Sequence, residues 1–201
     1  MGRPLFENAD FIAAARAIAD ERGPAGVTID SVTQLLKAPK GSFYYRFASR
    51  DALLGELWLS TVLDYQAGFV AALDADDGLA AALHTPIWAR SHLEKARLLL
   101  LYSRHDFVHG DWPAKLKRGV RDQAHRLESC MREFAHRTLG RIASGQLRRT
   151  QFVLLDVPVA AVKTHLERRE PPPPLVDELI AKTYHAVFDD AQPKRGIPRG
   201  R

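Results

Sequence analysis

Hydrophobic residues recur three and four positions apart along most of the chain, and no stretch alternates between apolar and polar residues as a β-strand does. This spacing predicts an all-α protein. An N-terminal helix is expected over residues 9–22, ended by Gly23 and Pro24. Further helices are expected at 49–73, 78–90, 92–108, 113–143, 146–155, 159–169 and 175–190.

Residues 28–50 carry the most informative pattern, which predicts two short helices joined by a tight turn. Thr28 suits an N-cap, and the first of these helices has one apolar face. Lys37 and Ala38 form the predicted turn, and Pro39 suits a first helical position. Phe43 and Phe47 lie four residues apart and are expected to point inward together. The members of the apolar face are Ile29, Val32, Leu35 and Leu36.

The charge of this segment agrees with a helix-turn-helix unit, and a surface helical hairpin with two solvated tyrosines fits the pattern about equally well. Its basic residues are Lys37, Lys40, Arg46 and Arg50, and its one acid is Asp30. A short basic helix that also carries hydroxyl groups suits phosphate and base-edge contacts in a major groove.

The run K-G-S-F-Y-Y-R-F-A-S-R-D-A-L at residues 40–53 resembles the signature of the tetracycline-repressor (TetR) family of bacterial transcription regulators. The resemblance covers about the first quarter of the chain. It implies a three-helix helix-turn-helix head on a helical ligand-binding and dimerisation body. The family usually has Gly in the turn, where this chain has Lys37. A left-handed Lys there costs about 1 kcal/mol, although its ammonium group could add a phosphate contact.

The same pattern predicts a set of DNA contacts. Lys40 and Ser42 are expected to meet the groove, with Tyr45 beside them. Gly41 would allow a close approach to the duplex. The residues expected to hold phosphates are Thr28, Tyr44 and Arg50.

The predicted domain organisation follows from these elements. Residues 1–48 form the DNA-binding domain, and 49–190 form the ligand-binding and dimerisation domain, of which 49–73 is a connecting helix. Four consecutive prolines at 171–174 act as a stiff spacer before the last helix. Residues 191–201 are expected to be a disordered basic tail.

Composition limits the other possibilities. The formal net charge is +5 and the pI about 9.5, which fits a nucleic-acid partner. The single cysteine, Cys130, excludes an internal disulfide framework and fits the reducing cytoplasm of a bacterium. No apolar run is long enough for a membrane span, and the N-terminus lacks a signal-peptide core.

Few residues suggest catalysis or a metal. His105 and His109 lie four apart around Asp106, which resembles the zinc-protease H-E-x-x-H with a shorter acid. A helical metal-dependent enzyme that uses these two histidines is therefore the alternative hypothesis. The acidic run at 74–78 lacks the ligand spacing of a calcium loop and is interpreted as a turn. We expect no enzyme activity, no metal and no resident cofactor.

The body is expected to bind a small-molecule effector whose identity the sequence does not give. Aromatic side chains in a helical body are mainly core residues, but some can line a cavity. The candidates are Tyr65, Trp88, Tyr102 and His105. Their mixture suggests a largely apolar ligand with one or two polar groups.

The last two predicted helices carry apolar faces that exceed what one chain needs to bury, unless they complete the monomer's own core. In the family that the chain resembles, the last two body helices pair across a two-fold axis. A homodimer would also let two recognition helices read a pseudo-palindromic operator. The sequence thus predicts a ligand-responsive dimeric regulator, a repressor released by its effector, although the opposite sign is equally allowed.

Overall fold

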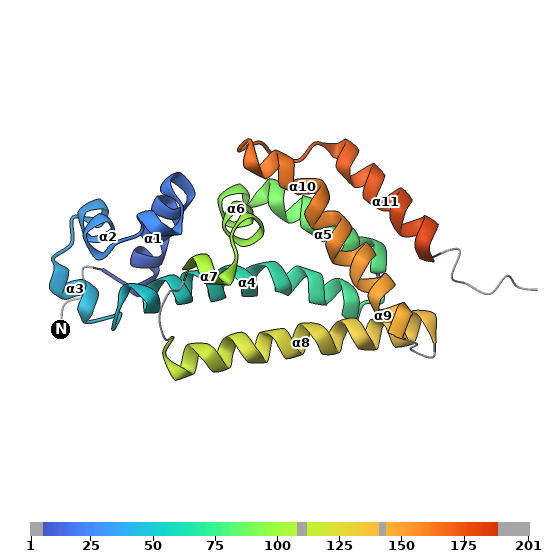
Figure 1. Cartoon of the computed structure of the whole chain (residues 1–201), viewed down its shortest axis with the longest axis horizontal. Coiled ribbons are helices and arrows are strands. Elements are labelled where there is room, and N and C mark those ends of the chain that lie inside the picture. Colours follow the sequence, from blue (N-terminus) through green and yellow to red (C-terminus); the bar gives the residue numbers. More distant parts are fainter. Residues whose placement is uncertain (1–5, 108–111, 141–143, 189–201) are drawn as a thin grey trace, which may run out of the picture.

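The computed structural model describes residues 6–107, 112–140 and 144–188, and within these ranges the chain is helical and has no strand. Figure 1 shows an elongated molecule with α1, α2 and α3 as a small head at one end and the remaining helices as a larger body. The predicted all-α fold, with a helix-turn-helix head on a helical body, is confirmed. The elements are α1 (Asn8–Arg22), η1 (Pro24–Gly26), α2 (Ile29–Leu36), α3 (Lys40–Tyr44), α4 (Arg50–Asp74), α5 (Gly78–Ser91), α6 (Leu93–Leu101), α7 (Arg104–Phe107), α8 (Ala114–Leu139), α9 (Ser144–Gln151), η2 (Phe152–Asp156), α10 (Val157–Glu167) and α11 (Pro174–Phe188).

Three phenyl rings form the centre of the head. Phe11 on α1 lies 6.0 Å from Phe43 and 6.0 Å from Phe47, measured between ring centroids, and Phe43 and Phe47 are 5.7 Å apart. All three are essentially fully buried. The i, i+4 spacing of Phe43 and Phe47 therefore places both rings against α1, as the sequence predicted.

Helix α4 belongs to both cores. Near its start Leu53, Leu54 and Leu57 pack into the head cluster, and farther along Tyr65 and Phe69 enter the body cluster. Figure 1 shows α4 running from the head through the body, with α8 alongside it. A three-helix head buries little apolar surface by itself, so docking on α4 supplies what it lacks.

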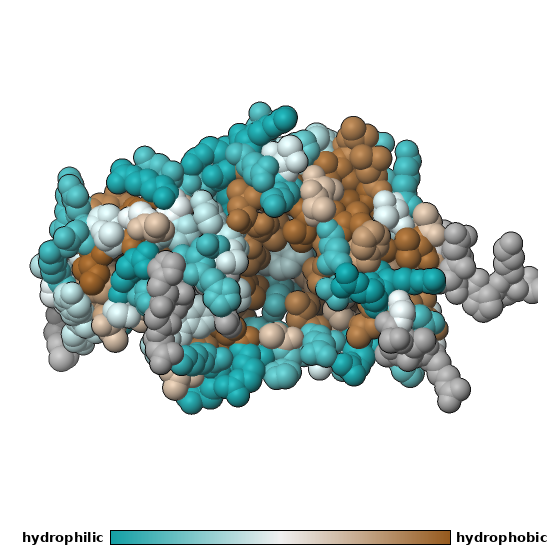
Figure 2. All heavy atoms as spheres, viewed as in Figure 1, coloured by the Kyte–Doolittle hydropathy of each residue, from teal (hydrophilic) through white to brown (hydrophobic). Residues whose placement is uncertain are grey.

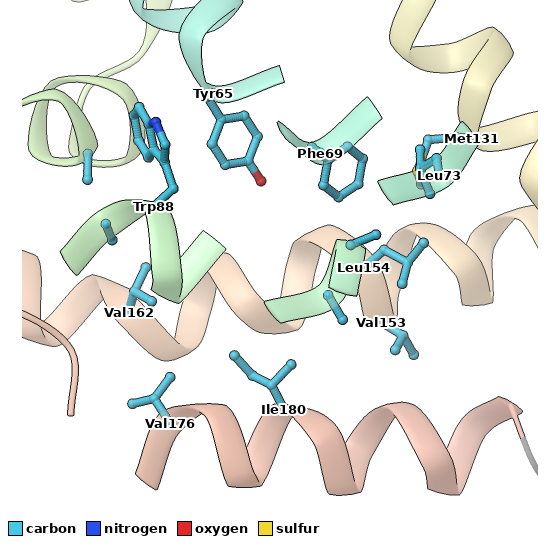
Figure 3. Close-up of a cluster of buried hydrophobic side chains, with 14 of the residues drawn as sticks. Tyr65, Phe69, Leu73, Trp88, Met131, Val153, Leu154, Val162, Val176 and Ile180 are labelled. Atoms are coloured by element: carbon cyan, nitrogen blue, oxygen red, sulfur yellow. The ribbon is translucent and has the colours of Figure 1, made fainter. Parts of the chain in front are cut away.

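Figure 3 shows the body core, where apolar side chains from α4, α5, α8, η2, α10 and α11 meet. Tyr65 and Trp88 lie close together, with ring centroids 5.2 Å apart in an edge-to-face arrangement. Val162 of α10 and Ile180 of α11 reach the same cluster. These two helices are therefore part of the monomer's own core on one of their faces.

The predicted helix at 92–108 is interrupted. Helix α6 ends at Leu101, and α7 begins only at Arg104. The Asp106 carboxylate accepts hydrogen bonds from the backbone N–H and the hydroxyl of Ser103, at 2.6 and 2.8 Å, and so caps a new short helix. Val108, the predicted helix end, lies outside the described residues.

The predicted break between residues 155 and 159 is wrong. α9, η2 and α10 follow one another without a gap, and the middle part, Phe152–Asp156, is a π-helix. Pro158 cannot donate the hydrogen bond that a regular helix requires. The wider π turn before it absorbs that defect, so the chain stays helical through the proline.

Residues 75–77 connect α4 to α5 as a turn, within the run 74–78 for which a turn was predicted. Asp77 caps α5, since its carboxylate accepts a hydrogen bond from the backbone N–H of Ala80 at 2.8 Å. The predicted basic tail at 191–201 lies outside the described residues. Among the helices of the described part, none combines the length and apolar character that a membrane span requires.

Asp20 joins the head to the body. Its carboxylate accepts a hydrogen bond from Arg97 Nε of α6 at 2.7 Å, and Arg169, just after α10, lies 3.2 Å away. Arg97 also donates to the carbonyl of Leu166, and Arg169 to the carbonyl of Asp20 at 2.8 Å. Asp20, two residues before the end of α1, is thus fixed to two parts of the body at once.

Candidate nucleic-acid interface

Local hydrogen bonds define both ends of α2, including the turn that leads to α3. The Thr28 hydroxyl accepts from the Ser31 N–H at 3.0 Å, while the Ser31 hydroxyl accepts from the Thr28 N–H at 2.9 Å. This reciprocal pair starts α2 at the predicted cap. At the other end Lys37 is left-handed, with φ 52° and ψ 37°. Its geometry lets the Ala38 N–H reach the Thr33 carbonyl at 2.9 Å and close the helix.

Pro39 is the N-cap of α3 and not its first helical residue, which is a small correction to the prediction. Its extended backbone, at φ −61° and ψ 143°, turns the chain into α3. The Ser42 N–H donates to the Pro39 carbonyl at 2.9 Å. The missing N–H of Pro39 therefore costs nothing, as at the predicted position.

Helix α3 presents two aromatic rings to solvent. Tyr44 is 59% exposed and Tyr45 is 87% exposed, whereas the preceding residue, Phe43, is fully buried in the head cluster. Tyr44 rests edge-on against Phe43, with centroids 5.5 Å apart, and the Arg46 guanidinium lies 5.5 Å from the centroid of Tyr45. Both rings are thus supported from within the head while their outer sides stay free for a partner.

The remaining predicted contacts on α3 lie on the same short helix. Lys40 and Gly41 are exposed, and Ser42 is half-buried. A Cβ placed on Gly41 would have no heavy atom within 4 Å, so this glycine is not required by packing inside the protein. An open glycine at the surface of a recognition helix fits the predicted close approach to a duplex.

Lys40 is paired in the free protein. Its ammonium group lies 2.6 Å from a carboxylate oxygen of Asp30 on α2, and both side chains are mostly exposed. The hydrogen bond to Asp30 and the charge of Asp30 raise the pKa of Lys40 above its ordinary value. Lys40 is therefore fully charged at neutral pH, and a phosphate would compete with Asp30 for it.

Arg50 has a structural role that the sequence analysis did not foresee. Its guanidinium donates to the carbonyl of Val27 and, at 2.8 Å, to that of Pro24, and it pairs with Asp51 at 3.3 Å. These bonds hold η1 and the start of α2 against α4. Most N–H groups of the Arg50 guanidinium are thus engaged within the head. Arg50 is therefore not among the proposed phosphate contacts.

A shallow hollow at the turn brings together further polar residues. It is lined by Asp30, Thr33, Gln34, Lys37, Ala38 and Lys40. The sequence analysis did not include Gln34, an exposed amide that can both donate and accept hydrogen bonds. Gln34 could have been predicted as a DNA contact from its position on the polar side of α2, one turn before the basic Lys37.

The four predicted effector-binding residues do not form one site. Tyr65 and Trp88 are buried in the body core, and their polar atoms already have partners. The Tyr65 hydroxyl is hydrogen-bonded to Thr85 at 2.8 Å, and Trp88 Nε1 donates to the Asp64 carboxylate at 2.9 Å. Burial raises the pKa of Tyr65 to about 12, so its hydroxyl stays protonated.

Tyr102 and His105 lie elsewhere. Tyr102 packs against the head cluster, 6.3 Å from Phe107 between ring centroids, and His105 is exposed on α7. His109, the second member of the alternative metal hypothesis, lies outside the described residues. Among the residues that the structure describes, no three His, Cys, Asp or Glu side chains gather as a metal site would need.

Comparison with known proteins connects this head to a family. Residues 11–57 match the family model described as "Bacterial regulatory proteins, tetR family". The predicted resemblance to this family is thus confirmed for the head. No curated protein sequence matches the chain.

Two solved structures share the fold over head and body. A protein assigned to the tetR family of transcription regulators, from Shewanella sp. PV-4, superposes with a TM-score of 0.66 at 14% identity, covering 91% of this chain and 96% of that chain. The transcriptional regulator FadR from Bacillus subtilis, in complex with stearoyl-CoA, superposes with a TM-score of 0.61 at 11% identity, covering 90% and 98%.

Proposed function

We propose that this chain, with its tetR-type head, is a dimeric repressor that binds a pseudo-palindromic operator and is released by a small molecule bound in its body. Lys40, Ser42 and Tyr45 meet the major groove, and Thr28 and Tyr44 contact phosphates. Gly41 lets the helix approach the duplex closely. Such a protein works in the bacterial cytoplasm, where its operator is.

The single observation that carries the proposal is the exposure of Tyr44 and Tyr45 at the end of α3, a short helix that begins with Lys40. Aromatic rings of this size are usually buried in a folded protein, yet Tyr44 and Tyr45 are exposed. The rings of Phe43 and Phe47 in the same segment are buried in the head cluster and fix its position. The rigid anchor fixes the direction of the exposed side chains. A pre-positioned helix with hydroxyl and ammonium groups is what groove recognition needs.

The exposed apolar residues of the body support a dimer. Leu175 and Leu179 on α11 are 57% and 53% exposed, and Phe152 is 47% exposed. On the face seen in Figure 2, apolar side chains gather over the region of α10 and α11, whereas the edge formed by α8 is mainly polar. A two-fold axis along α10 and α11 would cover these leucines and hold two heads about 34 to 36 Å apart for successive grooves.

The connections between head and body support a ligand-driven switch. Helix α4 shares its side chains between both cores, and Asp20 fixes α1 to α6 and to the end of α10. A ligand that favours one arrangement of the body would therefore change the spacing of the two heads. That FadR was solved with stearoyl-CoA supports a body of this fold as a site for an amphipathic effector.

The test of DNA binding uses the full-length protein and the DNA upstream of its own gene. Fluorescence anisotropy over a range of salt should show binding that weakens as salt rises. Tyr44→Ala should weaken binding to every duplex by about 1 kcal/mol, whereas Ser42→Ala should alter sequence preference more than the salt slope. Binding that is unchanged by salt and by both substitutions would refute the proposal.

The test of the dimer uses sedimentation velocity at micromolar concentration. The wild-type chain should sediment as a dimer, and Leu179→Glu should sediment as a monomer with unchanged helix content, because a charge would be buried at the axis. Glu178→Gln, on the neighbouring exposed position of α11, serves as the control and should remain dimeric. A monomeric wild-type protein would exclude the proposed dimer.

A further inference from the structure

Two hollows adjoin at Leu63 along the α4–α8 boundary, and together they are called the α4–α8 groove here. The first has a volume of about 300 Å³, the second about 410 Å³, and Leu63 lines both. The lining positions on α4 run from Ala52 to Val70, which spans about 27 Å at 1.5 Å per residue. Each hollow by itself has a volume in the range of ligand sites.

The part of the groove next to the head is mainly apolar, and the part at the body end is mainly polar. The head-end lining includes Ile12, Leu59, Leu63 and Leu116, together with Ser60 and the oppositely charged pair Glu56 and Lys115. At the body end Gln66, Gln123 and Arg126 face an aliphatic floor that includes Ala67 and Val70. An occupant must therefore be amphipathic, with its polar group at the body end and an extended apolar part toward the head.

Gln66 gives an independent sign that something is missing from this groove. The side chain is only 9% exposed, and its Oε1 atom is fully buried with no hydrogen-bond partner among the described residues. A buried amide oxygen without a donor costs about 1 to 3 kcal/mol relative to a satisfied one. A ligand, or a water that it carries, could supply the missing N–H or O–H.

The charge around the groove favours an anionic polar group. Arg126 and Lys115 are the two cations that line it, against one carboxylate, Glu56. The Arg126 guanidinium is hydrogen-bonded to the neutral Cys130 thiol, and its side chain is exposed at the groove end, where it can also meet an anionic group. An aliphatic carboxylate or phosphate ester placed there would gain a charge-assisted hydrogen bond.

We propose that the α4–α8 groove binds an elongated aliphatic molecule with an anionic or protonated acidic group, held by Arg126, Gln123 and Gln66, with its chain directed toward Ile12. This inference rests on the proposed function and names the effector class and its site. The groove includes a residue of α1, so the far end of the chain touches the DNA-binding head directly. Occupancy then sets the angle between α1 and α8 by contact, without relying on α4 alone.

The experiment is isothermal titration calorimetry of the full-length protein with decanoate, decanol and decyltrimethylammonium below their micellar concentrations. Decanoate should bind more tightly than either of the others. Arg126→Gln should weaken decanoate binding about tenfold or more, and Ala67→Trp, which places a ring in the groove from an exposed position, should abolish it. Arg121→Gln, an exposed position of α8 outside the groove, is the matched control and should bind like wild type.

Each outcome decides the matter. The assignment would be overturned if the protein did not bind decanoate or if it preferred the cationic probe. It would also be overturned if Arg126→Gln and Arg121→Gln bound decanoate equally well, or if Ala67→Trp still bound it. Operator binding is measured separately without any probe. If the operator binds and decanoate does not, this inference fails and the proposed function stands; if decanoate binds as described but the operator does not, the reverse holds.

Discussion

The left-handed backbone of Lys37 lowers the stability of the turn between α2 and α3. Its backbone is left-handed, where glycine has no steric penalty and a side chain costs about 1 kcal/mol. Lys37→Gly should therefore raise the free energy of unfolding by up to about 1 kcal/mol, measured by urea denaturation followed by circular dichroism. Lys37→Ala, which removes the ammonium group but keeps the strain, is the control. Equal stability of the Gly and Ala variants would contradict the strained turn.

The same pair of variants separates stability from recognition. If the Lys37 ammonium contacts a phosphate, both substitutions should reduce the slope of log affinity against log salt by about one contact. The chain would then retain a strained lysine because of its charge.

Gly41 should show opposite effects on folding and on DNA binding. Among the described residues, no atom beyond the chain neighbours and the backbone of α3 itself lies within 4 Å of an added Cβ, and alanine is the better helix former. Gly41→Ala should thus stabilise the protein by about 0.5 to 1 kcal/mol in urea denaturation. In the anisotropy assay it should weaken operator binding, because the methyl group would stand between α3 and the duplex. An unchanged operator affinity would mean that Gly41 lies away from the DNA.

At the level of elements, the start of α4 depends on one hydroxyl. Ser49 Oγ accepts a hydrogen bond from the Ala52 N–H at 3.1 Å, and Ser49 is exposed. Ser49→Ala should lower the free energy of unfolding by about 1 kcal/mol, and Ser49→Asp should restore it. Thermal and urea unfolding measure both. Equal loss in both variants would point to a role for the serine other than capping.

The elements of the head could be predicted from the sequence because their signals are local. Thr28 caps α2 three residues from its partner, and Phe43 and Phe47 are four residues apart. The role of Arg50 could not be predicted in this way. Its guanidinium binds carbonyls 23 and 26 residues earlier, and only the folded chain brings those groups together.

The elements and the site of the body were harder to predict for the same reason. The sequence pattern predicted two separate helices at 146–155 and 159–169, but a π turn before Pro158 keeps the helix continuous. Tyr65 and Trp88 looked like ligand residues, yet Thr85 and Asp64 satisfy their polar atoms within the core. The α4–α8 groove is lined by aliphatic and amide side chains spaced along two helices far apart in sequence, which no local pattern marks.

At the scale of the whole molecule, the question is how the head and body communicate. Several attachments between the described residues act in parallel: the shared helix α4, the packing of Leu98 and Phe107 into the head cluster, and the contacts of Asp20 with Arg97 and Arg169. The Asp20 attachment is the one that reaches the end of α10, next to the proposed dimer axis. A change at that axis can thus be transmitted to α1 without passing along α4.

The Asp20 attachment also makes the sharpest prediction about stability. The Arg97 side chain is 9% exposed and that of Asp20 is 16% exposed, whereas Arg169 is 51% exposed. Asp20→Asn would leave Arg97 buried without a counter-charge and should lower the free energy of unfolding by about 3 kcal/mol. Arg169→Gln removes a solvated partner of the same carboxylate and should cost less than about 1 kcal/mol.

Urea unfolding of the two variants, with operator affinity measured beside it, tests the coupling. If Asp20 transmits changes between body and head, Arg169→Gln should alter the effect of a bound effector on operator affinity while leaving the fold intact. The double variant Asp20→Asn with Arg97→Gln should recover part of the lost stability, because neither charge is then left unpaired. Similar small losses in both single variants would instead mean that Asp20 and Arg97 are solvated in solution, and the communication would then rest on α4 and the packing of Leu98 and Phe107.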